Sequence, residues 1–303
     1  MLFGVMSFDT FLQHLTNGIS LGSLYALIAI GYTMVYGILR LINFAHGDIF
    51  MMATYFAFFG VITFGVPWYI VFPVVILLTA VLGMSLEYTA YRPLRNAPKI
   101  SIMISAIGAS FFLENLAIVL FGGVNKAFPT PEIFTGVVKL GPVSLQRLTF
   151  YIPVITIVFL VLLVYLINNT KTGMAMRAVS KDHETAGVMG IDVNRTISIT
   201  FGIGSALAAI GALMWGLKFP QIYPLMGVMP GLKGFIAAVA GGVGNIKGAV
   251  LGGFILGVGE ILLVAFLPSD FTGYRDAFAF ILLIVVLLIK PTGILGEKIA
   301  EKV

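Results

Sequence analysis

Cysteine is absent from this chain and charge is scarce. The lack of cysteine among 303 residues excludes disulfide bonds, thiolate metal sites and cysteine nucleophiles. Only 10% of the residues are charged, whereas soluble domains carry roughly a quarter. Apolar residues make up 59% of the chain, and several runs of them reach the roughly 20 residues that a helix needs to span hydrocarbon. We therefore expect an all-α polytopic membrane protein, because helices satisfy their own backbone hydrogen bonds in lipid.

Machinery for self-powered transport is also missing. The phosphate-binding pattern G-x-x-x-x-G-K-[ST] does not occur. The predicted spans hold few carboxylates, namely Glu87, Glu114 and Glu260. We expect no basic residue in mid-span that could pair with these carboxylates, because Lys247 falls in a turn. An ion-coupled carrier usually shows such acid–base pairs inside the membrane. The energy for any transport is therefore expected to come from another subunit.

Enzyme chemistry is not expected either. The three histidines, His14, His46 and His183, fall near span ends or in loops, and none has metal-ligand spacing with another. We predict no catalytic residue, no metal site and no cofactor. The formal net charge is +5, but the basic residues sit in short loops, where they set membrane orientation instead of binding nucleic acid.

The apolar runs predict one transmembrane domain over 1–303, with eight or nine membrane elements. The stretch 220–259 is rich in glycine and proline, and we interpret 231–243 as a short or re-entrant helix. Pairs of glycines four residues apart imply close helix contacts, within one subunit or at a dimer seam. These pairs are Gly18/Gly22, Gly227/Gly231, Gly248/Gly252 and Gly253/Gly257. The eight longer spans are expected at about 12–38, 49–64, 68–90, 100–121, 148–167, 197–217, 249–267 and 277–289.

Loop charges predict the orientation. The segment 91–99 holds three Lys or Arg and the segment 170–196 holds four, so the positive-inside rule places both in the cytoplasm. The first 39 residues hold none, which predicts an outside N-terminus, and the loop at about 123–147 is then external. The tail residues Lys290, Lys298 and Lys302 predict a cytoplasmic C-terminus. That placement requires the short element to cross the bilayer.

The segment 170–196 is the longest strongly polar interval of the chain. Helical spacing divides it into two faces, as in a short amphipathic helix. We interpret it as a cytoplasmic handle through which an external motor acts. The predicted buried face comprises Ala175, Val179, Ala186 and Met189, and the predicted exposed face comprises Arg177, Lys181 and Glu184.

Several polar residues lie in or beside the predicted spans. Asn43, His46 and Asp48 can cap and pack the head of the second span, where an acid favours the positive helix end, or can form part of a pathway or gate. Glu114 and Asn115 can form an interhelical hydrogen bond or line a pathway. Glu260 can likewise form an interhelical hydrogen bond or line a pathway, and it can also lie at the contact between two subunits.

Motifs along nearly the whole chain resemble the permeases of bacterial branched-chain amino acid ABC transporters, in particular the shorter of the two paired permeases. The sequence INFAHGD at 42–48 is the most specific. Within 173–190 the resemblance implies a segment that contacts the ATPase, and its matching positions are Gly173, Arg177, Ala178, Asp182, Ala186 and Gly190. Lys181, on the predicted exposed face, is assigned to the same segment. The other matching stretches are NGISLGSLYALIAIGYTMVYG at 17–37, AYRPLR at 90–95, ISAIG at 104–108, GGVGNIKGA at 241–249 and KPTGILG at 290–296.

The resemblance implies a type II ABC importer-like permease in a bacterial or archaeal cytoplasmic membrane. Its expected partners are a second homologous permease in a heterodimer, two cytoplasmic ABC ATPases, membrane lipid, and a periplasmic or lipid-anchored binding protein. That binding protein would deliver leucine, isoleucine or valine. A related branch carries urea or short amides, and the motifs leave that alternative open. An ion-coupled secondary carrier is the alternative from another transport class.

Overall fold

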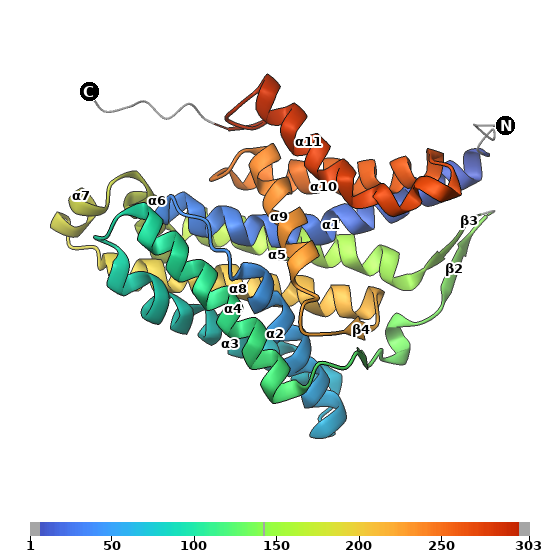
Figure 1. The fold of residues 1–303 in the computed structure, drawn as a ribbon, viewed down its shortest axis with the longest axis horizontal. Coiled ribbons are helices and arrows are strands. Elements are labelled where there is room, and N and C mark those ends of the chain that lie inside the picture. The colour runs from blue at the N-terminus through green and yellow to red at the C-terminus, as the bar shows by residue number, and fades with distance from the viewer. Residues whose placement is uncertain (1–6, 142, 297–303) are drawn as a thin grey trace.

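The computed structural model describes residues 7–141 and 143–296, and these are arranged as a bundle of long helices (Figure 1). The predicted tail charges Lys298 and Lys302 lie outside the described residues. The helices are α1 Phe8–Leu39, α2 His46–Phe58, α3 Trp68–Leu86, α4 Lys99–Phe121, α5 Arg147–Asn169, α6 Lys171–Lys181, α7 His183–Val188, α8 Val193–Lys218, α9 Val228–Gly241, α10 Ile246–Phe266 and α11 Arg275–Ile289. The strands are β1 Lys126–Ala127, β2 Val137–Leu140, β3 Val143–Gln146 and β4 Gln221–Ile222.

Within the described residues, eight helices are long and apolar enough to cross a membrane. This confirms the predicted spans, whose limits agree with the helices to within a few residues. Short π and 3-10 turns extend two of them: Phe59–Thr63 continues α2, and Glu87–Tyr91 with Arg92–Leu94 continues α3. The predicted short glycine-rich helix is α9, at Val228–Gly241.

Contacts at its two ends place α9 on a path across the bundle. Just before it, β4 pairs with β1 in the connection between α4 and α5, at the end of the bundle that carries the β2–β3 hairpin. The C-terminal end of α9 lies at the opposite end, where Gly241 packs against Gly248 and Gly244 lies near Gly37. The described chain therefore passes between the two ends nine times, which supports the nine-crossing alternative.

Glycines join α1 to α10 at the centre of the bundle. A Cβ added at Gly18 would lie 2.9 Å from Val258 Cα, and one at Gly22 would lie 2.9 Å from Phe254 Cα. Gly253 faces α1 in the same way, with Ala26 N at 2.6 Å from its added Cβ. These backbones meet so closely that no side chain fits between them. The predicted glycine pairs thus pack inside one subunit.

We expect Gly253→Val to destabilise the protein strongly, since the backbone of Ala26 cannot move away as a flexible side chain could. Thermal unfolding in detergent measures the effect. Gly108→Ala on α4 is the control, because nothing lies within 4 Å of its added Cβ, and it should leave the unfolding temperature unchanged or raised. Equal unfolding temperatures for the two variants would contradict the close packing of α1 against α10.

Candidate functional site

The segment predicted to contact the ATPase folds as two short helices, α6 and α7, which are joined at Asp182. The side chain of Thr170 accepts a hydrogen bond from Gly173 N and caps α6. Asp182 has an extended backbone, and its carboxylate accepts hydrogen bonds from Glu184 N and Thr185 N, both at 3.0 Å, which caps α7. These caps satisfy backbone donors that would otherwise have no partner at the start of each helix.

The break at Asp182 changes the predicted buried face. Val179 and Ala186 are buried as predicted, and Ala175 is half-buried. Met189 is 77% exposed, so its predicted burial is wrong, and Met176 is buried instead. A single helical period cannot be carried across a residue with extended backbone. The predicted exposure of Arg177, Lys181 and Glu184 is confirmed.

Contacts with the end of α5 hold α6 in place. The guanidinium of Arg177 donates a hydrogen bond to the backbone carbonyl of Ile167. Gly173 packs against the carbonyls of Leu166 and Ile167, where an added Cβ would overlap both. At the far end of the segment, Gly190 has φ +83°, a conformation that favours glycine. These contacts make α6 a rigid continuation of the membrane helix α5. Ala178, which lies on α6, is half-buried.

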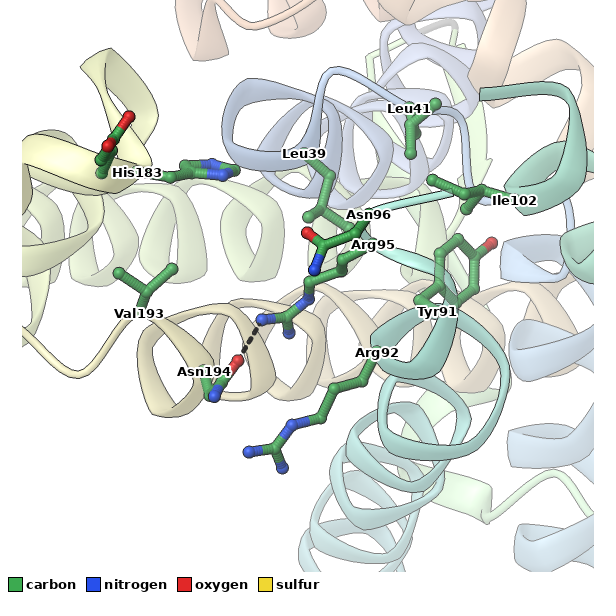
Figure 2. A pocket seen from close by; sticks show the side chains of 11 residues that line it. Leu39, Leu41, Tyr91, Arg92, Arg95, Asn96, Ile102, His183, Val193 and Asn194 are labelled. Atoms are coloured by element: carbon green, nitrogen blue, oxygen red, sulfur yellow. Dashed lines mark hydrogen bonds between the residues drawn. The ribbon is translucent and has the colours of Figure 1, made fainter. Parts of the chain in front are cut away.

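A pocket of about 460 Å³ separates α7 from the connection between α3 and α4 (Figure 2). His183 Nε2 lies 2.9 Å from the carbonyl oxygen of Ile38 near the end of α1. Across the pocket, Arg95 donates to Asn194 at the start of α8 and also pairs with buried Glu87. The segment thus contacts α1 directly and lies across this pocket from Arg95, whose hydrogen bond to Asn194 links α8 to the stretch that follows α3.

We expect Asp182→Ala to weaken the start of α7 by about 1 kcal/mol, the usual cost of losing an N-cap. Asp182→Asn is the matched control, because an amide oxygen can accept the same two hydrogen bonds. In reconstituted complexes the alanine variant should transport fewer molecules per ATP hydrolysed than the asparagine variant. If the two variants gave equal ratios, the cap would have no role in coupling.

The polar residues before and in α2 form a separate buried layer. Asn43 Oδ1 accepts a hydrogen bond from Tyr91 Oη at 2.9 Å, and Asp48 accepts one from Ser110 on α4. The residue at the N-cap position is Ala45, which has no side-chain hydrogen bond, so these side chains do not cap the helix. Asp48 does lie in the first turn, as predicted from the helix dipole.

His46 begins α2 in the bundle interior. It is fully buried, and its ring lies 4.4 Å from the Tyr32 ring, centroid to centroid, over Gly31. The ring lies close to the backbone of Ile28, but neither ring nitrogen makes a hydrogen bond of ordinary geometry in the part of the chain that the structure describes. A buried polar group without a partner is costly, so this position stays a candidate for a gate residue.

Glu114 and Asn115 form no interhelical hydrogen bond with another described residue. Asn115 is exposed and donates to the carbonyl of Phe111 on its own helix at 2.7 Å. Glu114 is half-buried and lies near enough to Asp48 to interact with it electrostatically. The two neighbours point to different sides of α4, because adjacent helical residues do not share a face.

Glu260 is part of a charge cluster that the sequence did not predict, and within it Glu260 and Lys233 are buried whereas Arg275 is exposed. Its carboxylate accepts from Lys233 Nζ and from Tyr25 Oη, both at 2.9 Å. Arg275 Nε also lies 2.9 Å from it, and Asp276 lies 2.6 Å from Lys233 Nζ. The expectation of no basic partner in the spans is therefore wrong. Lys233 lies in the short, glycine-rich α9 and not in one of the eight longer apolar runs.

Comparisons with known proteins place this chain among transport permeases. Residues 14–287 match the family model described as branched-chain amino acid transport system / permease component. The chain is 42% identical to the high-affinity branched-chain amino acid transport system permease protein LivH of Salmonella typhimurium, and the alignment covers 97% of the chain and 98% of the relative. It is 43% identical to BraD of Pseudomonas aeruginosa, a protein of the same description, with the same coverage.

Proposed function

Because this chain belongs to the branched-chain amino acid transport permease family, we propose that it forms a translocation path for leucine, isoleucine and valine across the cell membrane. The observation that carries this proposal is identity above 40% to such permeases over 97% of the chain. The relatives' descriptions favour branched-chain amino acids over urea or short amides. As a transport subunit it performs no chemistry on its substrate.

We infer that ATP hydrolysis by separate subunits supplies the energy. The buried Lys233–Glu260 pair removes one argument against an ion-coupled carrier, so the inference rests on the family and on the exposed α6–α7 segment. A second permease would complete a heterodimer, and two ABC ATPases would bind beneath the two permeases, with this segment contacting an ATPase. An external binding protein would deliver the amino acid. Closure of the ATPases would then move α6 and α7 as a lever attached to α5.

The proposed orientation puts the α6–α7 end of the bundle in the cytoplasm and the β2–β3 hairpin outside (Figure 1). The chain has no native cysteine, so single cysteines report topology without background. In intact cells, an impermeant thiol reagent should label Ser144→Cys in the hairpin and should not label Thr185→Cys in α7. The reverse pattern would overturn the orientation.

Reconstitution tests the proposed function. The chain should be purified with its second permease and ATPases and placed in liposomes with the binding protein. We expect uptake of leucine that requires ATP and stops when the binding protein is omitted. Uptake driven by a sodium or proton gradient without the ATPases would support the secondary-carrier alternative instead.

A further inference from the structure

A cavity of about 1440 Å³ opens at the end of the bundle that carries α6. Its walls come from the cytoplasmic halves of α5 and α10 in the proposed orientation, and the end of α1 and the end of α9 also border it. The cavity is several times larger than one amino acid side chain. It is distinct from the pocket beside α7, with which it shares no lining residue.

Three cations line this cavity, each from a different part of the chain. Arg40 follows α1, Lys181 ends α6, and Lys247 lies in the first turn of α10. All three are exposed, and none of them forms an ion pair with a described residue. No acidic residue is found among the described residues that line the cavity. The positive potentials of the three basic side chains therefore add, and the cavity favours an anionic group.

The rest of the lining suits an aliphatic ligand. Leu160, Val161 and Val164 of α5 form one apolar wall, and Val239 and Val250 lie on α9 and α10. The C-terminal ends of α1, α5 and α9 also border the cavity, and their carbonyl ends carry partial negative charge. Apolar walls and a cationic rim together match a branched side chain and a carboxylate.

We propose that this cavity is the exit site at which a branched-chain amino acid is held, by its carboxylate, before release into the cytoplasm. Arg40 and Lys247, which lie outside the α6–α7 segment, are the residues that attract the carboxylate, and Lys181 adds to the positive potential from the end of α6. The proposal rests on the proposed function, because that function supplies the identity of the ligand. Exposed ion pairs are individually weak, so binding should be roughly millimolar, which permits release.

Charge-selective labelling tests the cationic field of the cavity. Val250→Cys places the only thiol of this otherwise cysteine-free chain in the cavity wall, and the rates at which anionic and cationic methanethiosulfonates label this chain in the assembled complex are compared. We expect the anionic reagent to react about tenfold faster. Lys247→Gln should lower this rate ratio. Lys171→Gln, which neutralises an exposed lysine of α6 outside the cavity lining, should leave it unchanged.

Protection of the same thiol identifies the ligand. Leucine at millimolar concentration should slow labelling, whereas leucinol, which lacks the carboxylate, should not. Equal reagent rates, or equal protection by leucine and leucinol, would overturn the proposal. Slower labelling in phosphatidylglycerol vesicles than in neutral vesicles, with no effect of leucine, would assign the cations to a lipid phosphate instead and would also overturn it.

ATP-driven leucine uptake by the Val250→Cys complex separates this proposal from the proposed function. Normal uptake without protection by leucine would reject the exit site alone. Protection by leucine without any ATP-driven uptake, in a complex whose unsubstituted form also fails to transport, would reject the proposed function and leave the binding site standing.

Discussion

Arg177→Glu should uncouple leucine uptake from ATP hydrolysis while the protein stays in the membrane. Arg177 donates to the carbonyl of Ile167, close to the negative C-terminal end of α5. A glutamate there loses the charge-assisted hydrogen bond and faces a partial charge of its own sign. Such bonds contribute about 1.5–3 kcal/mol, so we expect uptake per ATP to fall at least about tenfold.

Lys171→Glu is the matched control for this variant. It makes the same charge change on the same helix, but at the N-terminal end of α6, where the helix dipole favours an acid. The measurement is the ratio of leucine transported to ATP hydrolysed in proteoliposomes. A normal ratio for Arg177→Glu would count against the assignment of α6 as the lever.

Glu260→Gln should destabilise the protein, because it removes the carboxylate that Lys233 and Arg275 share. Glu260 is 1% exposed, and Lys233 Nζ would keep Asp276 as its only acidic partner among the described residues. Breaking a buried ion pair from one side typically costs 3–5 kcal/mol, and the remaining pair with Asp276 puts our expectation at about 3 kcal/mol. Thermal unfolding in detergent gives the change.

Two further variants make the result interpretable. Glu132→Gln neutralises an exposed acid in the connection between α4 and α5, and it should leave the unfolding temperature unchanged. The double variant Lys233→Met/Glu260→Met removes both charges and should unfold at a higher temperature than Glu260→Gln. A single variant as stable as the unsubstituted protein would show that the cluster does not hold α9 and α10 together.

The spans were predictable because each is a long apolar run bounded by polar loops. The limits of α4, expected at 100–121, differ from Lys99–Phe121 by one residue at the start. The short helix α9 was also predictable, because glycine and proline interrupt the sequence on both sides of it. Hydrophobicity and length suffice for such elements, since membrane helices satisfy their own backbone hydrogen bonds.

The pairing of polar groups was not predictable in the same way. Lys233 and Glu260 are separated by 27 positions and lie on different helices, so only the packing of α9 against α10 brings them together. The burial of Met176 in place of Met189 depends on one extended residue, Asp182, which a helical wheel cannot represent. Asp182 is a good N-cap residue by type, and that signal could have located the break.

The central claim is that the ATPase subunits contact the α6–α7 segment. The most direct measurement is the rate at which a thiol reagent labels Thr185→Cys, on exposed α7, with and without bound ATPases. Lys139→Cys, in the proposed external hairpin, is the reference. We predict that the ATPases slow labelling at position 185 at least about tenfold and leave position 139 unchanged. An unchanged rate at position 185, in a complex shown to contain its ATPases, would contradict the account.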